Sequence, residues 1–188
     1  MRLALFGGTF DPIHQAHLAI AREAARRFHL DRVLFVPAAH PPHKRGVTHA
    51  PYEHRVHMAE LACRADPAFE VSRLEEHTAR SYSIDTIEKV RATLAPGDQL
   101  YFLIGADAFA EIRTWHRWRE VVRAVRFLVV SRPGRDYQAP AEAACERIDN
   151  IDLPISSSDI RRRLAAGERP EGVPDAVLRY VRKHNLYT

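Results

Sequence analysis

The stretch RLALFGGTFDPIHQAH, residues Arg2–His17, decides the fold of this chain. Its first part, Arg2–Phe6, is a short apolar run of the kind that forms a buried strand. Two glycines follow at once, and apolar residues then recur every three or four positions over Ile13–Phe28, which predicts a helix. A strand, a glycine turn and a helix in this order predict the first unit of a parallel α/β sheet, in which the backbone can pass close to a ligand.

The rest of the chain repeats this alternation. Further strands are predicted at Arg32–Val36, Phe69–Arg73, Gln99–Ile104, Arg126–Ser131 and Asn150–Ile155. Further helices are predicted at Pro51–Arg64, Ile84–Leu94, Ala108–Ile112, Trp118–Val125, Asp159–Ala166 and Pro174–His184. The pattern predicts a Rossmann-like, doubly wound, mainly parallel sheet with helices on both faces and a helical C-terminal segment. A length of 188 residues fits a single domain, with a core over 1–155 and helices over 156–188.

Composition narrows the environment of the chain and the class of its partner. The apolar runs are too short for a membrane span, the first residues lack the features of a signal peptide, and Cys63 and Cys145 form no CxxC pair. We therefore expect a cytoplasmic protein with reduced thiols and no membrane contact. The net charge of +4 suits an anionic partner, and composition leaves open whether this is a nucleic acid or a small phosphate ester.

The turn after Phe6 is a candidate ligand site, because parallel sheets bind ligands beyond the carboxyl ends of their strands. Asp11 and Pro12 fit an N-cap and a first helical residue, which would place His14 and His17 one turn apart on the same helix face. The positive end of a helix and two imidazoles together favour phosphate oxygens. The alternatives are two surface histidines or a metal pair, and the absence of an HExxH motif disfavours the metal.

The run GGTFDPIHQAH, Gly7–His17, resembles the signature of the adenylyltransferase branch of the nucleotidyltransferase superfamily with the (T/H)xGH motif. Relatives usually have Gly where this chain has Ala16. Alanine is the smallest replacement, so we expect a slight repositioning and no loss of activity. The resemblance implies that ATP is bound by His14, His17 and the residues before them, Gly7, Gly8, Thr9 and Phe10.

Two further segments resemble nicotinate mononucleotide adenylyltransferases. The tetrapeptide PPHK, Pro41–Lys44, is a stiff loop that could hold Lys44 over a triphosphate, or an exposed rigid turn. The preceding Ala38-Ala39 departs from the Asn residues of some relatives. The run SYSIDT, Ser81–Thr86, resembles the family's SYTxDT segment, which helps to hold the pyridine carboxylate and the ribose. Taken alone, Ser83 would be explained as an ordinary N-cap.

Two other segments follow predicted strands and match the same family. In IGAD, Ile104–Asp107, Gly105 lets an aromatic ring approach the backbone, and Trp115 could stack on a base or pack in the core. This spacing resembles the acceptor-binding segment of the family. In ISSSDIR, Ile155–Arg161, three hydroxyls would cap a helix or donate to phosphate, and Arg161 could pair with two oxygens. This run resembles the family's ISSTxIR motif.

The resemblance implies transfer of AMP from ATP to nicotinate mononucleotide, which gives nicotinate adenine dinucleotide and pyrophosphate in NAD biosynthesis. Adenine would lie near Ile104–Gly105 and the Ile155–Ser157 turn, and the triphosphate would carry Mg²⁺, held mainly by its own phosphates. The catalytic residues implied are His14, His17, Lys44 and Arg161. The ATP ligands implied are these two histidines and Arg161, the residues Gly7–Phe10, and Ile104, Gly105, Asp107, Ser156 and Ser157. The acceptor ligands implied are Thr9, Lys44, Tyr82, Ser83, Asp107 and Trp115.

Two alternatives stay open at this point. One is an adenylyltransferase of the same fold that acts on nicotinamide mononucleotide or pantetheine phosphate. The other is a basic nucleic-acid-binding module, although its arginines would then be expected on one face among aromatic residues. The sequence does not determine whether the chain forms homo-oligomers.

Overall fold

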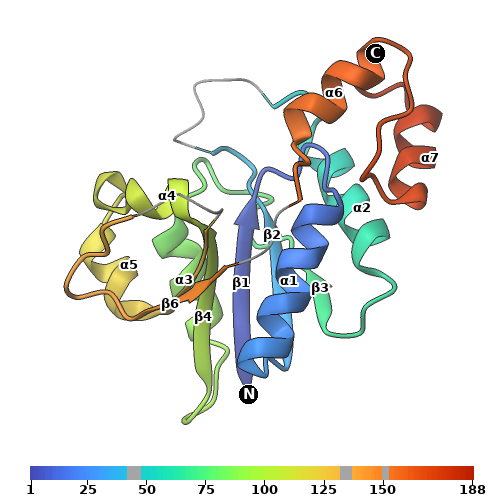
Figure 1. Ribbon diagram of the computed structural model, residues 1–188. Helices are drawn as coiled ribbons and strands as arrows, with labels where there is room; N and C mark the ends of the chain where they lie inside the picture. Colours follow the sequence, from blue (N-terminus) through green and yellow to red (C-terminus); the bar gives the residue numbers. More distant parts are fainter. Residues whose placement is uncertain (42–47, 132–136, 150–152) are drawn as a thin grey trace.

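The computed structural model describes residues 1–41, 48–131, 137–149 and 153–188. The fold is built around a six-stranded sheet (Figure 1). The strand order is β3-β2-β1-β4-β5-β6, and every neighbouring pair is parallel. This is the order of a doubly wound Rossmann-like sheet, so the predicted fold class is confirmed. The strands are β1 (Arg2–Gly8), β2 (Arg32–Pro37), β3 (Phe69–Val71), β4 (Gln99–Gly105), β5 (Arg126–Val130) and β6 (Cys145–Ile148).

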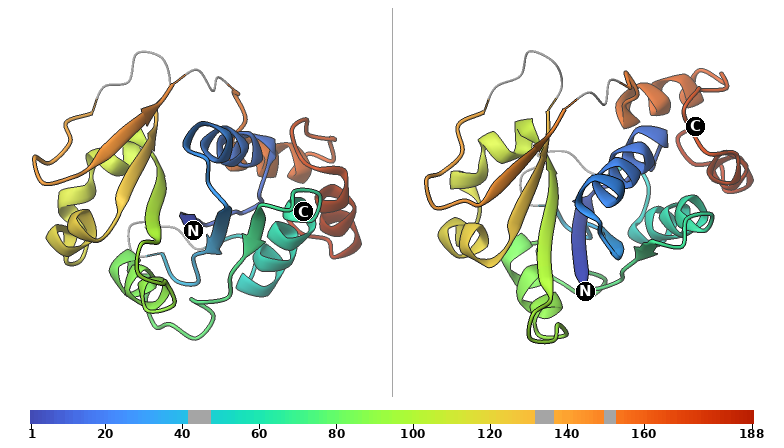
Figure 2. Two further views of the ribbon diagram at one scale, coloured as in Figure 1. Left: turned by 90° about the horizontal axis from the view of Figure 1, so that it is seen from below. Right: turned by 60° about the horizontal axis from the view of Figure 1, so that its bottom comes forward.

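Helices cover both faces of the sheet (Figure 2). The side chains of β1 alternate between two cores, as the pleat of a strand requires. Ala4 and Phe6 join the core under α1, α2, α6 and α7, whereas Leu3 and Leu5 join the core under α3, α4 and α5. The helical segments are α1 (Gln15–Phe28), α2 (Tyr52–Cys63), α3 (Ser83–Arg91), α4 (Ala106–Ala110), the 3-10 turn η1 (Ile112–Thr114), α5 (Trp118–Ala124), α6 (Ser157–Ala165) and α7 (Asp175–Lys183).

The two central strands determine where a ligand can bind. After β1 the chain passes to α1 on one face of the sheet, and after β4 it passes to α4 and α5 on the other face. Neighbouring strands whose connections leave in opposite directions open a crevice at their carboxyl ends. The crevice therefore lies where Gly7 and Gly8 end β1 and Gly105 ends β4.

The start of α1 differs from the prediction. The helix begins at Gln15 with His14 as its N-cap, and Asp11 is not a cap. The reason is tertiary, because the Asp11 carboxylate accepts the backbone N–H groups of His49 and Ala50 at 2.7 and 3.1 Å. The N-cap of α3 is also shifted by one residue, since Tyr82 occupies that position and Ser83 is the first helical residue.

The prediction of a last strand at Asn150–Ile155 was wrong. The strand lies earlier, at Cys145–Ile148, where it pairs with β5 at the edge of the sheet. Leu153–Ser156 is not a strand, and 150–152 lie outside the described residues. Glu146 and Arg147 are exposed in this edge strand, so no apolar run marks it in the sequence, whereas Pro154 lacks the N–H that a ladder needs.

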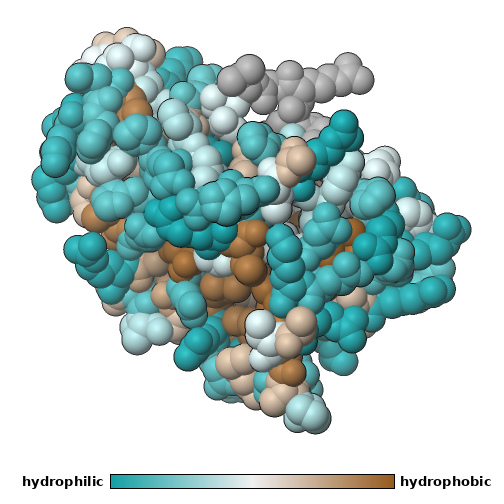
Figure 3. Space-filling view, turned by 180° about the vertical axis from the view of Figure 1, so that it is seen from behind, coloured by the Kyte–Doolittle hydropathy of each residue, from teal (hydrophilic) through white to brown (hydrophobic). Residues whose placement is uncertain are grey.

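The surface behind the sheet is mainly hydrophilic, with hydrophobic side chains gathered near the centre of that view (Figure 3). Within the four described ranges, no helix combines the length and apolar character needed to cross a bilayer.

Candidate active site

Two cavities adjoin at the carboxyl ends of β1 and β4. The first has a volume of about 380 Å³ and is lined by His14, His17 and residues of α4 and the start of α6; we call it the histidine cavity. The second has a volume of about 270 Å³ and is lined by Trp115 and several strand ends; we call it the tryptophan cavity. Phe6 and Gly105 line both, so one ligand could extend from one cavity into the other. The first volume is in the range of small-molecule sites, and the second is slightly smaller.

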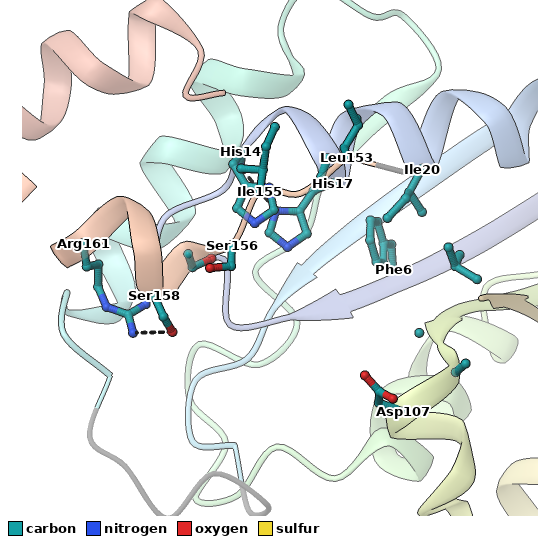
Figure 4. A pocket seen from close by; sticks show the side chains of 15 residues that line it. Phe6, His14, His17, Ile20, Asp107, Leu153, Ile155, Ser156, Ser158 and Arg161 are labelled. Carbon is teal, nitrogen blue, oxygen red and sulfur yellow. Dashed lines mark hydrogen bonds between the residues drawn. The ribbon is translucent and has the colours of Figure 1, made fainter. Parts of the chain in front are cut away.

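The two histidines lie at the N-terminus of α1, His14 as the N-cap and His17 in the first turn. Their rings stack with centroids 3.7 Å apart at an angle of 28°, at the wall of the histidine cavity (Figure 4). The backbone N–H of His14 donates to Nδ1 of His17 over 3.2 Å. A backbone amide can only donate, so Nδ1 of His17 is an acceptor and the proton of the neutral ring is on Nε2. His17 can therefore donate a hydrogen bond from Nε2 to a phosphate oxygen.

His14 is held in its neutral form by burial. Its side chain is 5% exposed, and desolvation lowers its pKa from 6.5 to about 4. Its Nδ1 atom is buried and has no hydrogen-bond partner among the described residues. A buried polar atom without a partner costs about 1–3 kcal/mol, and such costs concentrate at functional sites.

The start of α6 also lines the histidine cavity. Ser156 is the N-cap and its hydroxyl accepts the N–H of Asp159 at 3.1 Å, which confirms the predicted capping role of this serine run. Arg161 donates to the backbone carbonyl of Asp11 at 2.7 Å and to the hydroxyl of Ser158 at 3.2 Å. Ser157 donates to the carbonyl of Pro12 at 3.0 Å. These bonds attach α6 directly to the loop that precedes α1.

The charge of the histidine cavity suits a polyanion. The N-termini of α1 and α6 both meet it, and Arg161 contributes a guanidinium. Among the described residues that line it, Asp107 is the sole carboxylate. Within the described part of the chain, no group of three or more His, Cys, Asp or Glu side chains is placed to hold a metal ion. A divalent ion here would have to take most of its oxygen ligands from a bound phosphate chain and from water.

The tryptophan cavity has a different chemistry. Its walls are mainly backbone and apolar side chains, with the Trp115 ring packed edge-on to Phe102 at 6.0 Å and 71°. Gly8 is required for packing, because a Cβ atom there would lie 2.9 Å from the ring of Phe10. A Cβ atom on Gly105 would meet nothing within 4 Å, so the glycine leaves space where the two cavities meet. Such a site suits a flat ring rather than a string of charges.

Comparison with known proteins identifies the family. Residues 5–163 match the cytidylyltransferase-like family. A protein of Solibacter usitatus named as a probable nicotinate-nucleotide adenylyltransferase is 76% identical over 187 residues, which cover all of both chains. A protein of Thermus thermophilus with the same name is 45% identical over 192 residues, again with both chains covered completely. This chain belongs to the nicotinate-nucleotide adenylyltransferase family.

Membership of the nicotinate-nucleotide adenylyltransferase family makes the chain a nucleotidyltransferase, a class of enzyme that uses ATP with a divalent metal. The fold agrees with a solved structure, the Plasmodium falciparum nicotinic acid mononucleotide adenylyltransferase complexed with NaAD. That structure has a TM-score of 0.82 at 20% identity, and the match covers 99% of this chain and 97% of the other. The residues that line the two cavities all lie within the segment that matches the cytidylyltransferase-like family.

The structure divides the residues predicted from the family resemblance between the two cavities. The histidine cavity is lined by His14, His17, Gly105, Asp107, Ser156, Ser157 and Arg161. The tryptophan cavity is lined by Gly7, Gly8, Thr9, Ser83, Ile104, Gly105 and Trp115. Gly7, Gly8 and Ile104 were expected at ATP, and the structure places them at the tryptophan cavity.

Two of the predicted residues that the structure describes line neither cavity. The Phe10 side chain is 1% exposed and packs between Phe6 and Phe35, so this residue could meet a ligand only through its backbone. The Tyr82 ring stacks on His116 with centroids 4.3 Å apart. Lys44 lies outside the described residues.

Several lining residues were not predicted. Ile20, Val130 and Leu153 line the histidine cavity, and as ordinary apolar residues they carry no chemical signal in the sequence. Glu75 lines the tryptophan cavity although it is 6% exposed. Its position in a polar segment between β3 and α3 gave no sign of burial. Glu75 is recognised as part of the site only from its contacts in the folded structure.

Proposed function

We propose that this enzyme transfers AMP from ATP to nicotinate mononucleotide, with nicotinate adenine dinucleotide and pyrophosphate as products. The observation that carries the proposal is the junction of the two cavities at Gly105, one basic and polar, the other aromatic and largely apolar. A dinucleotide has central phosphates between two ring systems. Its phosphates would suit the basic cavity, and one of its rings would suit the aromatic cavity. The named activity of the 76% identical relative and the dinucleotide bound to the Plasmodium falciparum enzyme support it.

In the proposed reaction, a 5′-phosphate oxygen of the acceptor attacks the α-phosphorus of ATP in line. A bond forms between that oxygen and phosphorus, the bond to the β-phosphate oxygen breaks, and pyrophosphate leaves with the electron pair. The acceptor phosphate is already anionic near neutral pH, so a general base is superfluous. Catalysis then consists of positioning and of charge stabilisation at the phosphorus.

The protein groups assigned to that task are His17, His14 and Arg161. The Nε2–H of His17 and the guanidinium of Arg161 would donate to phosphate oxygens, and the neutral ring of His14 would complete the wall. The base would lie between Gly105–Asp107 and the Ile155–Ser157 turn, where apolar side chains line the same cavity. Lys44 stays a prediction for the β- and γ-phosphates.

The acceptor ring is assigned to the tryptophan cavity. Trp115 and the backbone of Gly7–Thr9 offer surfaces for a flat ring, and Gly7–Phe10 would also approach the ribose and α-phosphate of ATP at the junction. Ser83, the first residue of α3, brings N–H donors to the cavity wall. Such donors favour the carboxylate of nicotinate over the neutral amide of nicotinamide. Tyr82 and Asp107 are the remaining acceptor ligands predicted.

Mg²⁺ is the divalent ion that we propose, because its preference for phosphate oxygens and water fits a cavity with one carboxylate, Asp107. Bound there with ATP, it would neutralise phosphate charge. Among the described residues that line the histidine cavity, Asp107 is the carboxylate that could touch it or its water shell.

We also propose that residues 1–188 form one domain that works in the cytoplasm. Support comes from bonds between the C-terminal segment and the core, since Gln15 donates to the carbonyl of Gly172 at 2.8 Å and Tyr187 to Asp11 at 2.7 Å.

Steady-state assays of pyrophosphate release test the function. Wild-type enzyme is given Mg-ATP with nicotinate mononucleotide, nicotinamide mononucleotide or pantetheine phosphate. We expect kcat/KM to favour nicotinate mononucleotide by about 10-fold or more, since one charge-assisted hydrogen bond is worth about 1.5–3 kcal/mol. A preference for either other acceptor would overturn the assignment. Absence of turnover with all three, together with tight and salt-dependent binding of RNA or DNA, would support the nucleic-acid alternative.

A further inference from the structure

The segment after β2 forms one wall of the tryptophan cavity and is held by hydrogen bonds from several other segments. Ala38 and Pro41 line the cavity, and the N–H of Ala38 donates to the carbonyl of Gly8 at 2.8 Å. The next residues are held from the opposite side, because His40 exchanges hydrogen bonds with Ser81 at 2.9 and 3.1 Å. The wall is therefore attached both to the glycine loop and to the segment before α3.

Two buried charged side chains hold the same wall. Arg55, on α2, is 0% exposed and donates to the carbonyls of Ala38, Thr9 and Ala50 at 2.7, 2.8 and 3.1 Å. Burial lowers the pKa of this guanidinium, and the nearby Asp11 carboxylate opposes that shift. A buried cation is costly unless its donors are satisfied, and here three carbonyls from three separate segments satisfy them.

Glu75 is the second charge. Its Oε2 atom accepts the N–H of Ala39 at 3.3 Å, and its Oε1 atom accepts the hydroxyl of Thr86 at 2.8 Å. Thr86 lies on α3, is 6% exposed and does not line the cavity, whereas Glu75 does. The Ala38-Ala39 peptide is thus fixed at its carbonyl by Arg55 and at its N–H by Glu75.

We propose that Glu75 is a positioning residue that sets the shape of the acceptor site. Thr86 holds its carboxylate, and Arg55 binds the other side of the same peptide. The inference rests on the proposed function, in which the tryptophan cavity takes the acceptor. These residues contact the wall of that cavity, and none of the three lines the histidine cavity. Loss of the Glu75 contacts should therefore weaken acceptor binding and leave ATP binding nearly unchanged. A general loss of stability would not discriminate between the two substrates.

The test compares isosteric and conservative exchanges at two positions. Glu75→Met keeps the size of the side chain and removes both carboxylate oxygens, which accept the hydrogen bonds from Ala39 and Thr86. Glu75→Gln keeps one oxygen for Ala39 and can donate from its amide to the Thr86 hydroxyl, so it should restore much of the acceptor affinity. Thr86→Val removes the hydroxyl, and Thr86→Ser retains it. Thr93→Val makes the Thr86 exchange at an exposed position beyond the end of α3 and serves as the control.

Titration calorimetry with nicotinate mononucleotide and KM values for both substrates give the readout, at a temperature where circular dichroism shows each variant folded. We expect the acceptor KM and Kd to rise about 10- to 100-fold in Glu75→Met and about 3- to 10-fold in Thr86→Val, with the ATP KM changed less than about twofold. Glu75→Gln should lie nearer wild type than Glu75→Met.

An equal rise in both KM values, or an unchanged acceptor KM in Glu75→Met, would overturn the inference. If Glu75→Met does not fold, Thr86→Val against Thr86→Ser decides the same question. Failure of the proposed function is recognised separately, because wild-type enzyme would then neither bind nor turn over nicotinate mononucleotide.

Discussion

The histidine cavity and the tryptophan cavity share Phe6 and Gly105 but are built by different means. In the first, side chains at the N-termini of α1 and α6 meet the ligand space directly. In the second, Arg55 is buried behind the wall, and Glu75 lines the cavity but its carboxylate binds Ala39 and Thr86 of the protein itself. Charge is thus presented to the ligand in one cavity and used to organise the protein in the other. Substitutions in the first should act on phosphate chemistry, and those in the second on binding of the ring.

The largest effect is expected for His17→Ala. Loss of one donor to the phosphorus centre should lower kcat by about 10²–10³-fold, or roughly 3–4 kcal/mol, with a much smaller rise in the KM for ATP. Steady-state kinetics with Mg-ATP measure both quantities. His29→Asn, at the left-handed residue after the other end of α1, is the control and should keep wild-type kcat. An unchanged kcat in His17→Ala would remove His17 from catalysis.

The free energy of unfolding should depend on pH through His14, which lines the histidine cavity. Folding lowers the pKa of this ring from 6.5 to about 4, so between these values the unfolded chain binds the extra proton. The free energy of unfolding should therefore fall as pH falls from 6.5 to 4, by up to about 3 kcal/mol from this group. Urea unfolding at several pH values, compared with His14→Asn, isolates the contribution. Equal pH slopes for the two proteins would contradict it.

Arg161→Lys should come next in size. The guanidinium contacts Asp11 and Ser158 through different nitrogens, and lysine cannot reproduce that planar geometry. We expect kcat/KM for ATP to fall about 10- to 100-fold, because hydrogen bonds to charged groups are worth about 1.5–3 kcal/mol. Arg162→Lys, at an exposed arginine paired with Asp159, is the matched exchange. Similar losses in both variants would show that the effect is not local to the histidine cavity.

The smallest effect should come from Trp115→Ala, which tests the tryptophan cavity. Removing a stacking surface should raise the acceptor KM about 5- to 10-fold and leave the ATP KM near wild type, since stacking on one ring is worth about 1–3 kcal/mol. Trp118→Ala removes a tryptophan that packs against the same core but does not line the cavity. If Trp118→Ala changed the acceptor KM equally, Trp115 would be a packing residue rather than a ligand.

Part of the site could be predicted because several motifs lie at or soon after the ends of strands, and parallel strands end at one edge of the sheet. Gly105 and Trp115 were predicted at and after the end of β4, and Ser156 and Arg161 from the family motif at the start of α6; all four line the cavities. The burial of Arg55 is weakly indicated by the sequence, because this residue occupies the same helical face as the buried Met58, Ala59 and Ala62. An arginine on an apolar helix face indicates a buried functional charge, so the spacing of these residues predicts a buried Arg55.

What the sequence determined alone is local or periodic. The alternation of strands and helices, the glycine pair after β1, the serine cap of α6 and the family motifs all depend on residues close together in the chain. Tertiary structure decided the rest. Asp11 has the local features of a helix cap, yet it binds His49, Ala50 and Tyr187 instead, and Glu75 joins Ala39 to Thr86. Such partners are distant in sequence, and a polar side chain takes the partner that satisfies it best once burial has removed water.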